Sequence, residues 1–156
     1  MSRGKINIIK YDDSYRDQLG DILKALSKEL YGTGFCNLKA FVDRHWAIYL
    51  AIVDNKPVGF SSFIFNDWFG LRLPTIGNSY LYVTPEYRSG RAMFLLAKQM
   101  VLVSQDTNLP IEAYYASGMS RKMGKNRLEG KFLYDVYEYS PEDMIAGGKT
   151  LNKNIT

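Results

Sequence analysis

The residues best suited to chemistry lie at residues 88–92, Arg-Ser-Gly-Arg-Ala, where one sequence pattern gives way to another. The β-prone segment Ser79–Thr84 precedes them, and helical spacing of apolar residues follows from Ala92. A helix N-terminus has unpaired N–H groups and the positive end of the helix dipole, and a glycine there lets a ligand approach the backbone. Arg88 and Arg91 are unfavourable at that end unless an anion binds there. The segment therefore predicts a site for a pyrophosphate or nucleotide phosphate; the alternative is a turn in which the glycine only permits the chain to reverse.

The elements around this junction follow from periodicity and from turn residues. In chain order we expect a strand at Ile6–Tyr11, helices at 15–30 and Asn37–His45, strands at Trp46–Val53, Val58–Phe65 and Ser79–Thr84, a helix at 92–104, a strand at Ile111–Ala116, a helix near 120–128 and strands near Phe132–Tyr139. This order predicts an α/β (α+β) fold: a mixed, mostly antiparallel sheet with a central β-α-β crossover, flanked by helices. One domain is expected over residues 1–139, followed by a polar, loosely ordered tail over 140–156.

Composition limits the classes of function. The net charge of +4 favours anionic ligands only weakly. Nucleic acid is an unlikely partner, because no dense Lys/Arg stripe with interleaved aromatic residues precedes residue 121, and the basic run 120–131 is interpreted as a solvated face. One histidine and one cysteine nearly exclude a His/Cys metal site, so no metal is expected. Cys36 cannot form an internal disulfide, and neither a secretory h-region nor a run of about 20 apolar residues occurs, so a cytoplasmic protein without a membrane span is expected.

The stretch "VTPEYRSGRAMFLLA", together with the order of elements, resembles the GCN5-related N-acetyltransferase (GNAT) superfamily. Members have a strand ending in Val-x-Pro-x-x-Arg, an Arg/Gln-x-x-Gly-x-Gly/Ala loop and then a helix. The resemblance implies that the backbone amides of 88–93 bind the pyrophosphate of acetyl-CoA, and that the strand before them pairs through its main chain with the pantetheine arm. The residues so implied are Leu81, Tyr82, Val83, Arg88, Ser89, Gly90, Arg91, Ala92 and Met93. If the loop motif is aligned to begin at Arg88, its two positions for Gly or Ala hold Arg91 and Met93. If it is aligned to begin one residue earlier, Gly90 and Ala92 fit these positions, but Tyr87 replaces the Arg/Gln.

Acetyl transfer to an amine needs a deprotonated nucleophile, a polarised carbonyl and a proton for the leaving thiolate. The family often places a glutamate on the strand before the loop, but 77–82 has no carboxylate, and Asn126 stands where a tyrosine acid is common. We therefore predict Glu112 as the base, directly or through water, and Tyr134 as the proton donor. Glu112 could instead be a solvent-facing strand carboxylate. Tyr80 and Tyr114 are weaker alternatives to Tyr134.

The remaining candidates are weaker. His45, the only histidine, is interpreted as a capping or packing residue at a helix end. The aromatic loop 66–70 and the 12 tyrosines suggest an aromatic-lined groove for the acceptor.

Two functions follow. The first is an acetyl-CoA-dependent N-acyltransferase that moves an acetyl group directly to a primary amine of a small molecule, a peptide or a protein. The alternative is a non-catalytic module of the same fold that binds a protein or nucleic acid through 120–131, and a third, weaker hypothesis is a nucleic-acid binder that uses Arg88, Arg91 and 121–131. Pairing of edge strands between subunits would give a homodimer.

Overall fold

The computed structural model describes residues 4–113 and 140–147. The chain divides into two compact units, residues 1–115 and 116–156. The first unit contains the sheet and the helices that pack on it. Of the second, the described part is a helix at 141–147 with exposed side chains, which the lack of periodicity in the tail did not predict.

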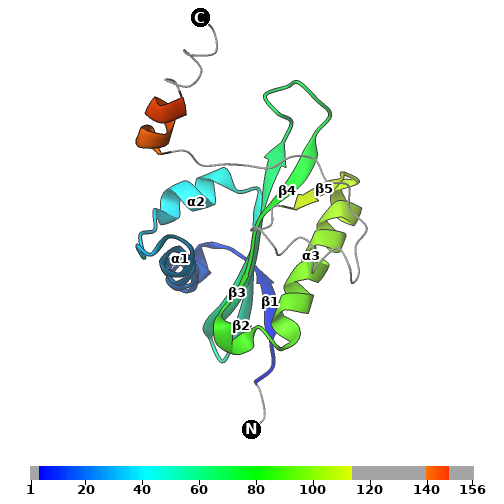
Figure 1. The fold of residues 1–156 in the computed structure, drawn as a ribbon. Helices are drawn as coiled ribbons and strands as arrows, with labels where there is room; N and C mark the ends of the chain where they lie inside the picture. Colours follow the sequence, from blue (N-terminus) through cyan, green and yellow to red (C-terminus); the bar gives the residue numbers. More distant parts are fainter. Residues whose placement is uncertain (1–3, 114–139, 148–156) are drawn as a thin grey trace, which may run out of the picture. The chain divides into compact units, whose positions relative to one another are not determined.

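Five strands form one sheet in the spatial order β1-β2-β3-β4-β5 (Figure 1). They are β1 (Asn7–Lys10), β2 (Ala47–Val53), β3 (Lys56–Asn66), β4 (Thr75–Val83) and β5 (Ile111–Ala113). Neighbouring strands are antiparallel, except that β4 and β5 are parallel and are connected through a helix. The predicted fold class, a mostly antiparallel mixed sheet with a central β-α-β crossover, is confirmed.

The helices cover both faces of this sheet. The α-helices are α1 (Arg16–Tyr31), α2 (Leu38–Arg44) and α3 (Arg91–Thr107), and the short 3-10 turns are η1 (Asp13–Tyr15) and η2 (Pro85–Tyr87). Figure 1 shows α1 and α2 on one face and α3 on the other. Gly32, with φ of 73°, ends α1, and the side chain of Asn37 accepts a hydrogen bond from the Ala40 amide at the start of α2.

Side chains alternate between the two faces of a strand, so each face has its own core. The core under α1 consists of Leu19, Ile22, Leu23, Leu26, Ile48, Leu50, Ile52, Phe60 and Tyr82. The core under α3 consists of two clusters, Ala51, Val53, Val58, Val83, Ala92 and Leu96, and then Ala47, Phe63, Ile76, Met100 and Val103. Each fully buried Leu, Ile, Val or Phe side chain contributes about 1.5–3 kcal/mol.

The strand β4 is longer than its sequence suggested. The prediction began it at Ser79, but it begins at Thr75, because Thr75–Asn78 pairs with β3 and mostly also with β5. The predicted helix near 120–128, the strands near 132–139 and residues 114–116 lie outside the described residues.

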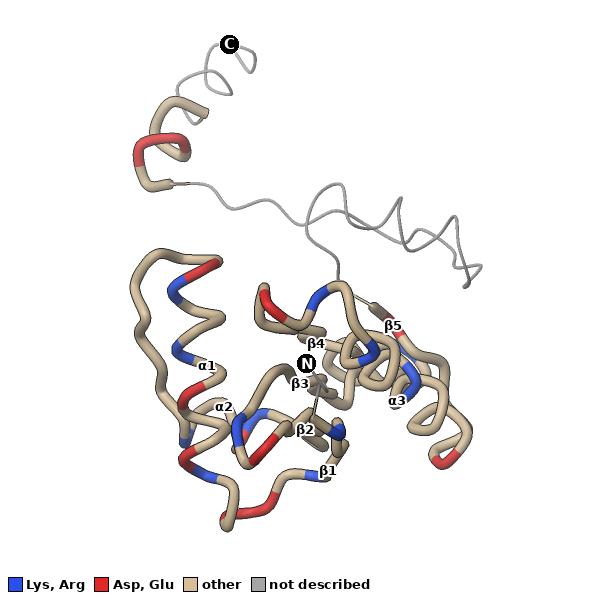
Figure 2. Tube along the Cα trace, turned by 90° about the horizontal axis from the view of Figure 1, so that it is seen from below, with Lys and Arg blue, Asp and Glu red and all other residues tan. Residues whose placement is uncertain are grey.

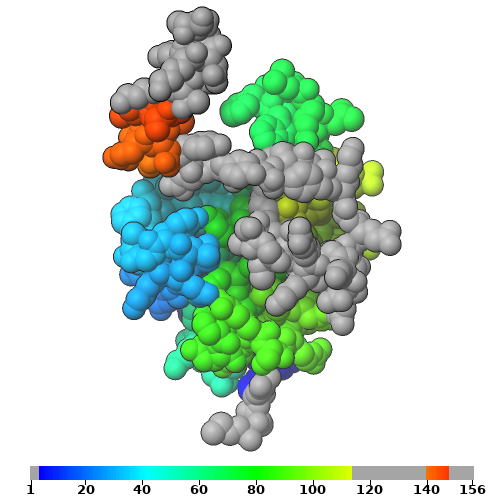
Figure 3. All heavy atoms as spheres, viewed as in Figure 1, coloured from blue at the N-terminus to red at the C-terminus, as the bar shows by residue number. Residues whose placement is uncertain are grey.

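The tip of the hairpin between β3 and β4 stands out from the surface (Figure 3), and its exposed side chains are largely apolar. Trp68, Phe69 and Gly70 have left-handed backbones, with φ of 51°, 60° and 80°. Phe69, Leu71 and Leu73 are almost fully exposed. The loop that was expected to line an acceptor groove therefore points much of its apolar surface into solvent.

Charges of both signs alternate along the helices of the first unit (Figure 2). On α1, for example, Arg16 is followed by Asp17, and Lys28 by Glu29. The helix at 141–147 differs, because it has Glu142 and Asp143 and no basic residue, and no helix in the described part of the chain is long and apolar enough to cross a bilayer.

Candidate functional site

The edge of β4 next to β5 is paired over only part of its length. The two strands are in register from Ile76–Ile111 to Asn78–Ala113. Beyond that point, Tyr80–Val83 pairs with β3 on one side, and Ser79–Val83 faces no described strand on the other. Its outer main-chain groups can therefore pair with an extended ligand. Leu81, Tyr82 and Val83, predicted to bind a pantetheine arm, lie on this stretch.

A β-bulge lies where the pairing of β4 with β5 stops. Ser62 of β3 pairs with Tyr80, but Phe63 pairs with Asn78, so Ser79 is the extra residue. Bulges bend a strand and redirect its side chains, and they are common beside active sites. The buried amide of Asn78 stabilises this one, because its Nδ2 donates to Ser61 Oγ at 3.1 Å and to the main-chain oxygens of Ser62 and Tyr80 at 3.1 and 3.0 Å.

The turn that follows β4 leads directly into α3. Gly90 is the N-cap of α3, in an extended conformation (φ −106°, ψ −167°), and it offers no side-chain cap to the first amides. Ser89 and Arg91 are exposed, whereas Ala92 is fully buried. Met93 packs against the core under α3, so its side chain does not block the approach to the helix N-terminus. Ser89–Met93 therefore lie at the N-terminus of α3, and anion binding there stays a prediction.

The two arginines of the turn have different surroundings. The Arg88 guanidinium forms an ion pair with Glu29 of α1, donates to the Val83 carbonyl at 2.9 Å through Nε and lies 5.6 Å from the centre of the Tyr82 ring. Among the described residues Arg91 forms no ion pair. Arg88 therefore holds the turn against α1. The guanidinium that is available to bind an anion is that of Arg91.

Glu29 also accepts a hydrogen bond from the Tyr82 hydroxyl at 2.8 Å. The hydrogen bond from Arg88 is the main cause that lowers the pKa of Glu29. Burial, followed by the bond to Glu29, raises the pKa of Tyr82 to about 12. Glu29 could not be recognised from the sequence, because no spacing pattern links it to Arg88, 59 positions away.

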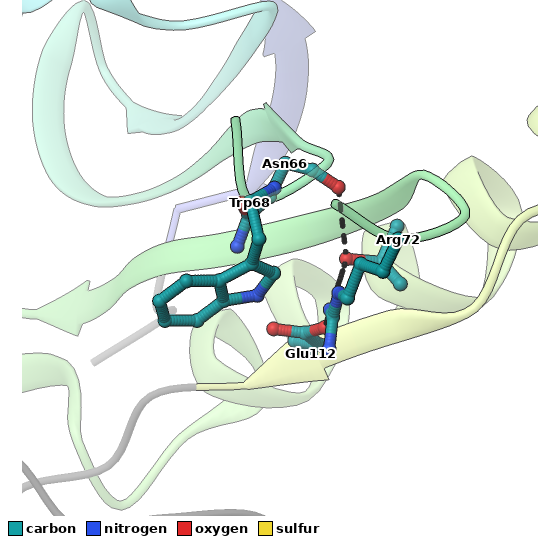
Figure 4. A network of polar contacts seen from close by, with 5 residues as sticks. Asn66, Trp68, Arg72 and Glu112 are labelled. Carbon is teal, nitrogen blue, oxygen red and sulfur yellow. Dashed lines mark hydrogen bonds and ion pairs between the residues drawn. The ribbon is translucent and has the colours of Figure 1, made fainter. Parts of the chain in front are cut away.

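Glu112, the predicted base, lies on β5 in a network with the hairpin (Figure 4). Its carboxylate is only 8% exposed, forms an ion pair with Arg72 and accepts a hydrogen bond from Thr75 Oγ1 at 2.9 Å. Arg72 in turn lies 5.6 Å from the centre of the Trp68 ring. Glu112 is therefore not a solvent-facing carboxylate. Tyr134, the predicted proton donor, lies outside the described residues.

A cavity of about 420 Å³ opens between α1, the segment before α2 and β4. Its lining is Leu23, Leu26, Ser27, Tyr31, Thr33, Phe35, Cys36, Asn37, Phe41 and Tyr80. The hydroxyls of Tyr31 and Tyr80 are 3.3 Å apart, and burial raises the pKa of Tyr80 to about 12. Among the described residues, the lining of the cavity is apolar and aromatic with hydroxyl groups, and it includes no carboxylate or basic side chain.

His45 also lies at the bulge, although the sequence favoured a capping or packing role. Its ring stacks on Phe41, with centroids 4.0 Å apart, so packing is part of its role. Its Nε2 lies 2.7 Å from Ser79 Oγ, which joins it to the extra residue of β4.

Comparison with solved structures identifies the fold. A ribosomal-protein-alanine N-acetyltransferase from Brucella melitensis biovar Abortus 2308 superposes with a TM-score of 0.69 at 14% identity, over 87% of this chain and 100% of that one. An aminoglycoside N-acetyltransferase in complex with CoA gives 0.66 at 14% identity, over 90% and 99%. An aminoglycoside acetyltransferase from an uncultured soil metagenomic sample, in complex with sisomicin, gives 0.66 at 9% identity, over 86% and 97%.

No family model and no curated protein matches the chain. The structural likenesses show that the chain has the fold of the GNAT superfamily, as the sequence predicted. At these identities they establish the fold alone.

Proposed function

We propose that the protein is an acetyl-CoA-dependent N-acyltransferase that moves the acetyl group directly to a primary amine of a small molecule, a peptide or a protein. The observation that carries the proposal is the edge Ser79–Val83, which faces no described strand on its outer side and leads into the glycine-capped N-terminus of α3. A slender thioester arm would pair along the edge, and its diphosphate would meet the amides of 90–93.

The fit of CoA rests on the chain's own residues. The four residue-to-residue steps from Ser79 to Val83 span about 13 Å at roughly 3.3 Å per residue. This length separates the anion site at α3 from the bulge, so the thioester end would lie near Ser79 while the diphosphate lies near Arg91. Bound there, the cofactor would supply the activated acetyl group, and the binding of CoA by an aminoglycoside N-acetyltransferase of the same fold supports CoA as the ligand.

The acceptor would occupy the cavity beside Tyr80. Because the described lining is apolar and aromatic and includes no carboxylate, it favours a single amine on an apolar or aromatic body over a polycationic aminoglycoside. The Tyr31 and Tyr80 hydroxyls would orient the polar end of such an amine. Glu112 and Tyr134 stay the residues predicted from sequence as base and acid, and Tyr80, protonated at neutral pH, is the described alternative donor for the thiolate.

Isothermal titration with acetyl-CoA, followed by detection of released thiol, tests the proposal. We expect binding, and turnover with tyramine that exceeds turnover with sisomicin. Gly90→Glu should abolish binding by placing a carboxylate against the diphosphate, whereas Gly90→Ala should retain it, because the extended backbone of Gly90 suits any residue. Binding without turnover across a broad panel of amines would indicate the non-catalytic module. Absence of binding would overturn the proposal.

A further inference from the structure

The hydrogen bonds of His45 determine which of its nitrogens holds the proton. Nδ1 lies 2.6 Å from the carbonyl oxygen of Phe41, one turn earlier in α2. A carbonyl can only accept, so Nδ1 must donate. In a neutral imidazole the other nitrogen, Nε2, is then an acceptor. The backbone of α2 thus holds His45 in the tautomer whose basic nitrogen points to β4.

Ser79 is the donor that faces this nitrogen. Its Oγ lies 2.7 Å from His45 Nε2 and 3.3 Å from the Ser62 carbonyl, so its single proton goes to the nearer acceptor. Ser62 Oγ, 2.6 Å from Ser79 Oγ, then donates to it. The result is a directed chain of hydrogen bonds from Ser62 through Ser79 to the imidazole.

The position of Ser79 makes this chain relevant to the proposed reaction. Ser79 is the extra residue of the bulge and the first residue of β4 beyond its pairing with β5. The thioester end of a ligand on the open edge would lie there. Tyr80, the next residue, lines the cavity assigned to the acceptor, and so does Phe41, on which His45 stacks. An amine in that cavity would meet the thioester beside the Ser79 hydroxyl.

The electrostatic surroundings keep His45 neutral at pH 7. Burial lowers its pKa below the usual 6.5, and the bond to Phe41 opposes this in part. The titratable groups beside it are those of a second cavity, Lys10, Tyr11, Asp12 and Asp13 from β1 and the turn after it, with Tyr80 from β4 and Asp43 and Arg44 from α2. Among the described residues, no carboxylate forms an ion pair with the ring.

We propose that Ser79 and His45 form a proton relay for the acceptor, in which the ammonium gives a proton to Ser79 Oγ while Ser79 passes its own proton to His45 Nε2. The proposal rests on the proposed function. Ser79 touches the substrate, and His45 is the positioning residue that receives the charge. The imidazolium so formed keeps both hydrogen bonds, because Nδ1 still donates to Phe41 and Nε2 now donates to Ser79.

Bonds and protons also balance in the remaining steps of the acetyl transfer. The free amine forms the C–N bond to the thioester carbonyl, and the C–S bond breaks to release the thiolate. The second amine proton neutralises this thiolate, directly or through a tyrosine hydroxyl. The products are the amide, CoA thiol and one proton on His45, which leaves to solvent. No oxidant, metal or further reactant is required.

The kinetic test compares four variants across pH 6 to 10 with acetyl-CoA and tyramine. His45→Gln and Ser79→Ala should lower kcat/KM at pH 7 about 10²-fold. The loss in kcat/KM should become smaller as pH rises, because the amine is then already deprotonated and does not need the relay. Ser79→Thr should restore most activity through its hydroxyl. Ser104→Ala is the control, since it removes a partly buried hydroxyl of α3 that donates to the Leu109 carbonyl and contacts neither His45 nor Ser79, and it should keep the wild-type profile.

A spectroscopic test uses the fact that His45 is the only histidine in the chain. In protein labelled with 15N-histidine, the two ring nitrogens should report a neutral Nδ1–H tautomer at pH 7 and a pKa below 6.5. Ser79→Ala should shift the Nε2 resonance. A charged ring or the opposite tautomer at pH 7 would overturn the relay whether or not turnover is seen.

The outcomes separate the two proposals. If wild-type protein does not turn over any amine, the proposed function fails and the relay fails with it. If it turns over but His45→Gln loses the same factor at every pH, or Glu112→Gln alone removes the dependence on pH, only the relay is overturned.

Discussion

Arg88, in the turn before α3, forms an ion pair with Glu29 of α1, and the same guanidinium donates to the Val83 carbonyl at the end of β4. These contacts connect α1, β4 and the turn that leads to the anion site. Ion pairs at this exposure contribute about 0–1 kcal/mol. The main role of Arg88 is therefore to hold the turn in place, and its contribution to the free energy of unfolding is small.

Substitution of the two arginines should separate these roles. Arg88→Ala should lower the free energy of unfolding by about 1 kcal/mol, with a small effect on acetyl-CoA affinity. Arg91→Ala should leave stability unchanged and weaken acetyl-CoA binding about tenfold or more, because it removes a charge-assisted contact to phosphate. Urea unfolding and isothermal titration measure the two quantities. The reverse pattern would show that Arg88 is the residue that contacts the ligand.

The lowered pKa of Glu29 predicts the direction in which the free energy of unfolding changes with pH. Its pKa is lowered in the folded state, mainly by Arg88, so its contribution to stability is present above the usual carboxyl pKa and is lost as pH falls through the folded value. Glu29→Gln should therefore be less stable than wild type at pH 7, and the difference should shrink as the pH falls below the usual carboxyl pKa. Urea unfolding at pH 7 and in acid checks this, and a difference that does not shrink in acid would contradict it.

The sequence predicted the elements well because their signals are local. The helical spacing at 15–30, the turn at Asp54–Asn55 and the glycine after α1 each depend on neighbouring residues, and each is found in the structure. The start of β4 was predicted four residues late. Thr75–Asn78 forms a strand because it pairs with residues of β3 and β5 that are distant in sequence.

The candidate site was less predictable for the same reason. The turn 88–92 has a local signature, and it was found. Glu29 reaches Arg88 only through the fold, and His45 reaches Ser79 only through the bulge. The single histidine was visible in the sequence, but the residue that it faces was not.

Asn78 should be essential for the geometry of the bulge. Its buried amide serves three acceptors, on Ser61, Ser62 and Tyr80. Asn78→Ala leaves these acceptors without their donor and should cost about 1–3 kcal/mol of stability. It should also lower turnover, since Ser79 is no longer held in place. Urea unfolding and thiol release check the two effects, and full stability in Asn78→Ala would show that the bulge does not depend on the amide.

Gly59 of β3 allows α3 to pack closely on the sheet. A Cβ at this position would lie 2.6 Å from the Tyr82 carbonyl oxygen and 2.9 Å from Leu96 Cδ1 of α3. Gly59→Ala should therefore force the backbone of β4 or the helix to move, at a cost of about 1–3 kcal/mol. The urea midpoint should fall, and acetyl-CoA binding should weaken with it, because β4 is the proposed binding edge.

Gly20 offers the matched control for the same substitution. It lies inside α1, where a Cβ would meet only Leu38 Cδ2 at 4.0 Å. Because glycine is disfavoured in a helix interior, Gly20→Ala should stabilise the protein by about 0.5–1 kcal/mol. The two variants make the same chemical change and should move the urea midpoint in opposite directions. A midpoint for Gly59→Ala at or above that of wild type would mean that β3, β4 and α3 are not packed as closely as the distances at Gly59 require.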